Sequence, residues 1–332
     1  MSLSAKADEL SEGEVCVKSL FIANLKAGDD LDNEPFLLQD VVRRTTKDNR
    51  PYLLYTLRDK TGSLSGVFWD VPDYVDSWAK PGLAILLTGK VNNYKEALQV
   101  RATDMNPYKA SSMRDFLPSS KRSGEELKAA LEEQIGRLAE PWQGLARHLL
   151  LTEPFSTDYC NAPAARGMHH AYIGGLLEHS LSMAQLGWKL AEHYDYVNVN
   201  RLVCGALIHD MGKALEYEVA EGFAFSQDGR LVGHIVRAIV LLEKAAAEIN
   251  FPADELQQLV HLVGSHHGTQ EWGSPVTPKT LEAILLHQLD LLDSRVQGYF
   301  DHVNNDAGQG EWTTRSSDMF RTELRKPDGY SG

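Results

Sequence analysis

The sequence predicts a protein of two domains, a small β domain followed by a larger all-α domain. Three features support this prediction. The chain has 332 residues, which exceeds the usual size of a single domain. Residues 15–110 alternate between apolar and polar side chains in short runs, as strands do, whereas residues 125–303 repeat apolar side chains at the spacing of helices. The polar, turn-rich residues 111–124 are the predicted linker between them.

In the first domain, the pattern predicts five strands, over residues 36–44, 51–59, 63–70, 83–91 and 97–105. The second and third strands are joined by Asp59-Lys60-Thr61-Gly62, a hairpin signal in which glycine can adopt a positive φ. A second hairpin turns around residues 92–95, and residues 72–80 are a predicted helical insert between the two hairpins. Five strands with such an insert favour a small Greek-key barrel of the oligonucleotide-binding (OB) type.

The predicted barrel has the side chains of a single-stranded nucleic-acid surface. Residues 38–60 hold six basic and three acidic side chains, although the whole chain has a formal net charge of -13. Basic groups bind phosphates and aromatic faces stack under bases. The candidate contacts are Arg43, Arg44, Tyr52, Arg58, Trp69 and Tyr94. The alternative is that the aromatic residues are core, and strand alternation puts Tyr52 and Tyr55 on opposite faces, so at least one of them packs inside.

The distribution of charged residues and cysteines bears on which partners and which cellular compartment the protein has. Residues 1–110 hold 14 basic and 16 acidic side chains out of totals of 33 and 46, so most of the acidity lies in the second domain. Bulk charge therefore excludes indiscriminate binding to polyanions. Cys16, Cys160 and Cys204 have no paired spacing, which favours a reducing cytoplasm. The polar N-terminal arm, residues 1–14, and the lack of a long apolar run predict no membrane association.

The second domain is predicted to be a bundle of helices. They are expected over residues 123–138, 141–151, 172–193, 201–208, 231–249, 253–264 and 278–300. Residues 304–332, with several glycines and mixed polarity, are a predicted tail or partner-dependent arm that leaves room for a homo-oligomer.

Histidines and aspartates recur at the ends or in the middle of these helices. His209 and Asp210 close an apolar run, and Asp210 follows the buried-face residue Ala206 by four positions. A buried carboxylate is costly unless it is paired or binds a metal. The other members of the set lie on successive helices and are His179, His234, His266, His267 and Asp290. Imidazoles with carboxylates suit iron, manganese, nickel or zinc better than calcium, and more than four ligands suggest two ions.

Each member also has a purely structural alternative, because a single buried histidine is usually a hydrogen-bonded core residue. The histidines outside the set are expected to have only that structural role, and they are His148, His193, His261, His287 and His302. Asp293, one turn after Asp290, competes with it as a ligand or is an ion-pair partner. Lys213 follows Asp210 by three and can reach the same pocket, or can bind the last carbonyls of its helix.

The set resembles the HD-domain superfamily of metal-dependent phosphohydrolases, over about residues 153–300. Five segments are similar, more narrowly, to the bacterial 3′ to 5′ exoribonuclease family of the YhaM type. They read MHHAYIGGLLEHS from residue 168, HDMGK from 209, GHI from 233, SHHG from 265 and EWGSP from 271. Members of that family join an N-terminal OB domain to an HD domain, which is the order predicted here for residues 15–110 and 125–303.

The resemblance implies two metal sites that share Asp210. His179, His209, Asp210 and Asp290 would hold one ion, and Asp210, His234, His266 and His267 the other. Lys213 would neutralise charge on the phosphate. His169 and His170 would contact the terminal nucleotide, unless they cap the helix that follows.

The implied activity is 3′ to 5′ hydrolysis of single-stranded RNA, with DNA as a further substrate, to nucleoside 5′-monophosphates. A hydroxide activated between two ions would attack phosphorus. Mn²⁺ is the expected metal, with Fe²⁺, Ni²⁺, Mg²⁺ or Zn²⁺ as alternatives. Two rivals stay open at this point. One is a nucleotide or cyclic-dinucleotide phosphohydrolase with a regulatory barrel, and the other is a non-catalytic nucleic-acid-binding protein with a structural metal site.

Overall fold

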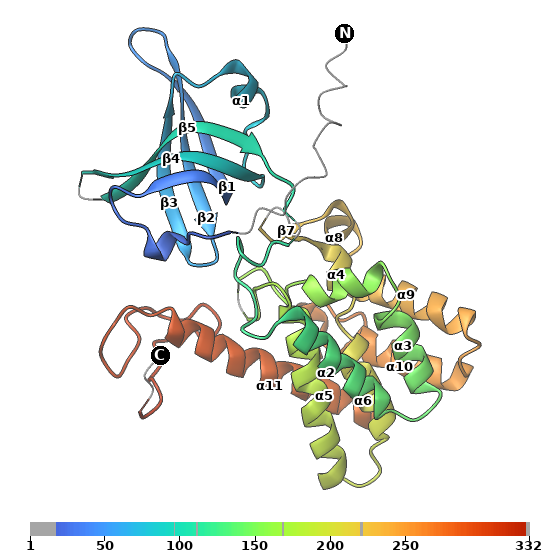
Figure 1. Cartoon of the computed structure of the whole chain (residues 1–332). Helices are drawn as coiled ribbons and strands as arrows, with labels where there is room; N and C mark the ends of the chain where they lie inside the picture. Colours follow the sequence, from blue (N-terminus) through green and yellow to red (C-terminus); the bar gives the residue numbers. More distant parts are fainter. Residues whose placement is uncertain (1–17, 96, 111, 168, 220–221, 330–332) are drawn as a thin grey trace, which may run out of the picture. The chain divides into compact units, whose positions relative to one another are not determined.

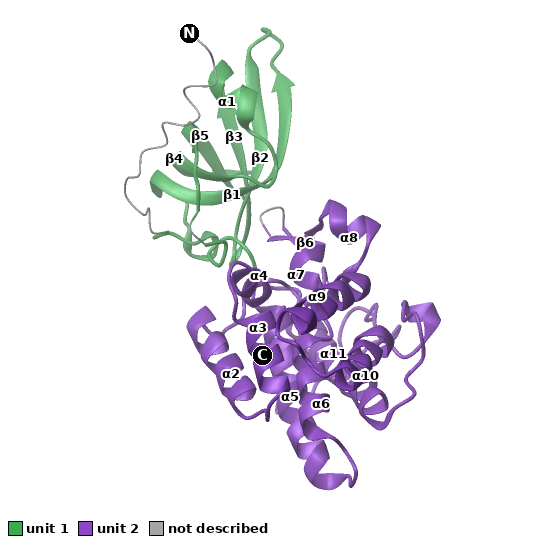
Figure 2. Ribbon diagram, turned by 90° about the vertical axis from the view of Figure 1, so that its right-hand side faces the viewer, with its two compact units in different colours: residues 1–118 green, residues 119–332 purple. Residues whose placement is uncertain are grey.

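The chain forms two compact units, residues 1–118 and residues 119–332, in a computed structural model (Figure 2). Its structure is described for residues 18–95, 97–110, 112–167, 169–219 and 222–329. The N-terminal arm, Cys16 and Met168 lie outside the described residues. No helix in the described part of the chain is long and apolar enough to cross a membrane.

The first unit is a closed five-stranded barrel, as predicted (Figure 1). Its strands are β1 (Asp30–Thr45), β2 (Pro51–Asp59), β3 (Gly62–Trp69), β4 (Ala84–Tyr94) and β5 (Ala97–Pro107), in the order β1-β2-β3-β5-β4. The predicted insert is α1 (Asp73–Trp78). β1 begins six residues earlier than expected because two register shifts let it pair first with β4 and then with β2. The parallel pairing of β3 with β5 closes the barrel.

The barrel aromatics divide between core and surface. Tyr55 is 3% exposed and its hydroxyl donates to the Val100 carbonyl at 3.3 Å, so it packs inside. Tyr52 lies on the other face, opposite Trp69 on β3, with ring centroids 4.7 Å apart. Tyr94 and Trp69 are exposed. Arg43 donates to Asp76 at 2.5 Å and to the Ala79 carbonyl, which ties it to the region of α1.

The second unit is helical, and most of its helices lie where apolar spacing predicts them. They are α2 (Gly124–Gly136), α3 (Trp142–Leu150), α4 (Phe155–Asn161), α5 (Gly175–His193), α6 (Val199–Ile208), α7 (Lys213–Glu216), α8 (Gln227–Leu231), α9 (His234–Glu248), α10 (Ala253–Ser265) and α11 (Leu281–Asn304). Ser123 and Glu126 form a reciprocal capping box at the start of α2. The apolar α6 packs against α3, α5, α10 and α11, so its C-terminal end lies among them.

Three departures from the predicted elements bear on the site. α5 begins at Gly175, three residues late, because Gly174 adopts φ +83° and a Cβ on Gly175 would overlap the His170 carbonyl. α4, α7, α8 and the hairpin of β6 (Tyr217–Glu218) with β7 (Ala224–Phe225) are too short to show periodicity. The segment after α11, expected as a tail, contains the bridges Trp312 to Arg325 and Ser317 to Thr322.

Candidate metal centre

All seven residues predicted as ligands come together in the helical unit. They arrive on α5, at the ends of α6 and α10, at the first residue of α9 and in the middle of α11. Their donor atoms form three overlapping groups in which every atom lies within 4.8 Å of the others. The groups are Asp210-His234-His266-His267, His179-His209-Asp210 and His209-His266-Asp290. A fourth group joins His170, His179 and Asp293.

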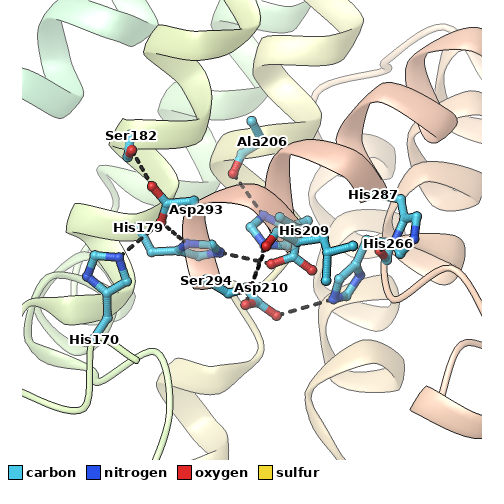
Figure 3. A network of polar contacts seen from close by, with 12 residues as sticks. His170, His179, Ser182, Ala206, His209, Asp210, His266, His287, Asp293 and Ser294 are labelled. Atoms are coloured by element: carbon cyan, nitrogen blue, oxygen red, sulfur yellow. Dashed lines mark hydrogen bonds and ion pairs between the residues drawn. The ribbon is translucent and has the colours of Figure 1, made fainter. Parts of the chain in front are cut away.

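Asp210 is the centre of the cluster (Figure 3). Its Oδ1 lies 3.4 Å from His266 Nε2 and 3.5 Å from His234 Nε2. Its Oδ2 lies 3.4 Å from His209 Nε2 and accepts a 2.6 Å hydrogen bond from Lys213 Nζ. Asp210 therefore faces three imidazoles and one ammonium while its side chain is only 2% exposed.

Three of the histidines are held by backbone carbonyls. The Nδ1 atoms of His209, His266 and His267 lie 2.9, 2.7 and 2.7 Å from the carbonyls of Ala206, Val263 and Trp272. A carbonyl oxygen only accepts, so Nδ1 must carry the proton. In the neutral ring, Nε2 is then left with a free lone pair, the form in which histidine binds a metal.

Two more histidines are held by carboxylates that lie outside the predicted ligand set. His179 Nδ1 lies 2.7 Å from Asp293 Oδ2, and Asp293 is itself held by Ser182 (Figure 3). His234 Nδ1 lies 3.2 Å from Glu216 Oε1, which also accepts from the His234 backbone N–H at 3.1 Å. Of the two roles that the sequence left open for Asp293, the structure shows the ion pair, which Asp293 forms with His179.

The burial of unpartnered donor atoms tests whether this set fits a metal. Among the described residues, the Nε2 atoms of His179, His209, His234 and His266 and the Oδ1 atom of Asp210 are buried without a hydrogen-bond partner. Buried polar atoms are normally satisfied, and leaving several unsatisfied in one place is costly. A divalent cation would satisfy all of them, and a set of imidazole nitrogens and carboxylate oxygens suits transition metals. The residues therefore fit a metal centre.

Charge in the cluster keeps the carboxylates ionised. Burial opposes the ionisation of Asp210, but the positive charge of Lys213 and the nearby imidazoles of His209 and His266 hold its pKa well below the usual range. Burial likewise opposes the ionisation of Asp290, but the imidazole of His179, whose Nε2 lies 3.3 Å from Asp290 Oδ1, outweighs burial and lowers the pKa of the carboxyl. Burial also opposes the protonation of His179, yet the neighbouring carboxylates of Asp290 and Asp293 raise its pKa to about 9 in the metal-free protein.

The two histidines expected at the substrate lie in different surroundings. His170 is 3% exposed, and its ring lies 3.0 Å from Asp293 and 2.8 Å from the Tyr172 hydroxyl. It therefore contacts the carboxylate that holds His179 and not the cavity. His169 instead lines a cavity of about 640 Å³. Burial, followed by the charge of Lys213, lowers the pKa of His169 to about 3, so it is neutral.

The cavity connects the metal centre with the surface of the unit. Lys213, His267 and Asp290 line it together with Trp272 and His287, which the sequence had not assigned to a site. His287 Nδ1 lies 2.8 Å from the His266 carbonyl. The only feature of the sequence that could have placed His287 near the site is its position three residues before Asp290 on the same helix.

Two family models match the two units. The description "HD domain" matches residues 176–295, and "OB-fold nucleic acid binding domain" matches residues 37–108. The chain is 29% identical over 310 residues to a 3′-5′ exoribonuclease YhaM of Geobacillus sp. (strain WCH70), covering 92% of this chain and 94% of that protein.

Solved structures match parts of the chain at low overall scores. The HD domain of the L. monocytogenes phosphodiesterase PgpH has a TM-score of 0.28 and 19% identity, over 44% of this chain and 74% of its own. The second OB-fold domain of replication protein A from Methanococcus maripaludis has a TM-score of 0.22 and 19% identity, over 28% and 97%. From the full-length similarity and the two domain matches, we conclude that the chain is a homologue of the 3′-5′ exoribonuclease YhaM, with an OB-fold domain followed by an HD domain.

Proposed function

We propose that this protein is a divalent-metal-dependent 3′ to 5′ exoribonuclease that degrades single-stranded RNA to nucleoside 5′-monophosphates. The observation that carries the proposal is the set of buried imidazole Nε2 atoms around Asp210 that, like Asp210 Oδ1, have no hydrogen-bond partner among the described residues. The full-length similarity to a protein named as a 3′-5′ exoribonuclease supplies the polarity and the substrate. Cys204 is a buried free thiol, which suits the cytoplasm.

The seven proposed ligands would be shared between two metal ions. His179, His209, Asp210 and Asp290 would hold one ion, and Asp210 would share a second with His234, His266 and His267. Two divalent cations, of which Mn²⁺ is the expected choice, would supply an activated water and neutralise the phosphate charge. Lys213 has its ammonium beside Asp210 and lines the cavity, so it would add a positive charge next to the phosphate.

The OB unit would hold the strand that the HD unit cuts. Tyr52 and Trp69 offer adjoining aromatic faces, and Tyr94 is exposed near the end of β4. Arg44 and Arg58 would add positive charge, and Arg43 keeps charge at the surface beside Asp76. Stacking of this kind tolerates any base, so the same surface would accept single-stranded DNA.

The test uses the purified full chain with Mn²⁺ and a 5′-labelled single-stranded RNA. We expect a ladder that shortens from the 3′ end, 5′-monophosphates as products and no reaction in excess chelator. Asp210→Asn should remove activity, whereas His193→Asn, at the exposed end of α5, should keep it. Intact RNA beside a hydrolysed nucleotide or cyclic dinucleotide would instead identify a small-molecule phosphohydrolase. Metal binding without hydrolysis of either would identify a structural site.

A further inference from the structure

Several residues that line the cavity beside the candidate metal centre have no role in the proposed function. One side is formed by α11 with Arg295, a second by Trp272, and a third by Asp318, Met319 and Arg321 from the C-terminal segment, residues 306–326. This segment follows α11 and folds beside the end of that helix (Figure 1). A stretch expected as a tail therefore lines the same cavity as Asp290 and Lys213.

The C-terminal segment is fastened at several points, so its position is built into the unit. Asp306 accepts hydrogen bonds from the Thr314 backbone and hydroxyl and lies 3.0 Å from Lys326 Nζ. His302 Nε2 lies 3.0 Å from the Arg315 carbonyl, and the Tyr299 hydroxyl donates to the Arg325 carbonyl. These contacts link both ends of the segment to each other and to the last turns of α11.

The cavity wall formed by these elements holds two arginines, Arg295 and Arg321, against one carboxylate, Asp318. Both are exposed, and in the described part of the chain neither guanidinium makes an ion pair. The rest of this domain is strongly acidic. Two such arginines in the cavity that Lys213 also lines are suited to a phosphate, because a planar guanidinium binds phosphate oxygens in pairs.

Trp272 offers an aromatic face at the same cavity. Its side chain is 54% exposed, while its carbonyl is held by His267 Nδ1 at 2.7 Å and the next residue, Gly273, adopts φ +98°. Its ring lies 6.3 Å from that of His287. The backbone of Trp272 is thus fixed to a predicted metal ligand, and its indole is free to stack on a base.

We propose that this cavity binds the terminal nucleotide of the substrate, with Trp272 stacking on the base and Arg295 and Arg321 binding phosphate oxygens. The C-terminal segment thereby forms part of the substrate site. That this nucleotide lies at the 3′ end rests on the proposed function. The binding of a nucleotide by the cavity does not, since it follows from the aromatic face and the two arginines.

The test measures binding of 5′-AMP to the Mn²⁺-loaded full chain by calorimetry. Arg321→Ala and Trp272→Ala should each weaken binding roughly tenfold, the effect of one charge-assisted hydrogen bond or one stacked base. Arg315→Ala is the matched control on the same segment, and Trp312→Ala matches Trp272 because it is 55% exposed and lies outside the cavity lining. Both controls should change the affinity less than twofold.

A second ligand separates the two contacts. Ribose 5-phosphate lacks the base, so its affinity should fall with Arg321→Ala and stay unchanged with Trp272→Ala. Arg321→Lys, which retains the charge, should recover part of the loss and shows that the fold is intact. Failure of the wild-type protein to bind 5′-AMP, or an affinity of both variants equal to that of the wild type, would overturn the proposal.

RNA digestion distinguishes this proposal from the proposed function. In an active nuclease, Arg321→Ala should raise KM for RNA with little change in kcat. If RNA stays intact while 5′-AMP affinity responds to the variants as expected, the exoribonuclease assignment fails and the nucleotide site stands. If RNA is digested and the variants change neither 5′-AMP affinity nor KM, the nuclease stands and the site assignment fails.

Discussion

Replacing Asp210 by asparagine should damage both the fold and the chemistry, and the two effects can be separated. Asp210 and Lys213 form a 2.6 Å ion pair in which the side chains are 2% and 10% exposed. Removing one charge of a buried pair strands the other and typically costs about 3–5 kcal/mol. In a metal-free protein, Asp210→Asn should therefore lower the midpoint of thermal unfolding of the helical domain by roughly 10 °C.

A second substitution removes the stranded charge. Lys213→Met replaces the buried ammonium group with an uncharged side chain of similar length. The double variant, Asp210→Asn with Lys213→Met, should therefore regain most of the lost stability. It should not regain activity, because asparagine lacks the negatively charged carboxylate whose two oxygens face His209, His234 and His266. We expect RNA hydrolysis to fall on the order of a thousandfold or more in both the single and the double variant.

The measurements are thermal unfolding in excess chelator and RNA digestion with Mn²⁺, on the full chain. Asp195→Asn, an exposed substitution of the same kind, is the control and should alter neither. A double variant that regained activity with stability would refute the reasoning, since Asp210 would then be needed only for folding. A single variant as stable as the wild type would show that the pair with Lys213 contributes no net stability.

Three further outcomes follow from the structure. Asp293→Asn removes the carboxylate that orients His179, so Mn²⁺ affinity by calorimetry should fall by about 10- to 100-fold while the helical content is kept; an unchanged affinity would remove Asp293 from the metal centre. In the metal-free protein the pKa of His179 is raised to about 9 by Asp290 and Asp293 against burial, so the stability it contributes is complete below about pH 6.5, the pKa of unfolded histidine, and is lost as pH rises through 9. Thermal unfolding in chelator should show that decline, and a midpoint that rises over the same range would contradict it. Gly66→Ala places a Cβ against the Tyr55 ring, so urea unfolding of the barrel should show a loss of about 1–3 kcal/mol that Tyr55→Leu relieves; no loss would mean that the ring can move aside.

Local pattern predicted the architecture of both units. Strand alternation and turn residues located the β2–β3 hairpin to within a residue, because the period of two and the Asp59–Gly62 turn are local properties. Helical spacing likewise placed the seven proposed ligands at helix ends or helix centres, where their side chains could meet. The joint occurrence of His209-Asp210 with the other histidines predicted the cluster that the structure forms around Asp210, although no single residue could.

Tertiary structure alone decided which groups support the proposed ligands and what surrounds the cavity that we propose for the substrate. His170 and Asp293 lie 123 positions apart in the chain and only 3.0 Å apart in space, and no periodicity relates such residues. The orientation of each imidazole depends on which carbonyl or carboxylate its Nδ1 meets, as Glu216 and Trp272 show. The C-terminal segment reads as a polar tail, because its position depends on long-range hydrogen bonds to single atoms rather than on a buried apolar face.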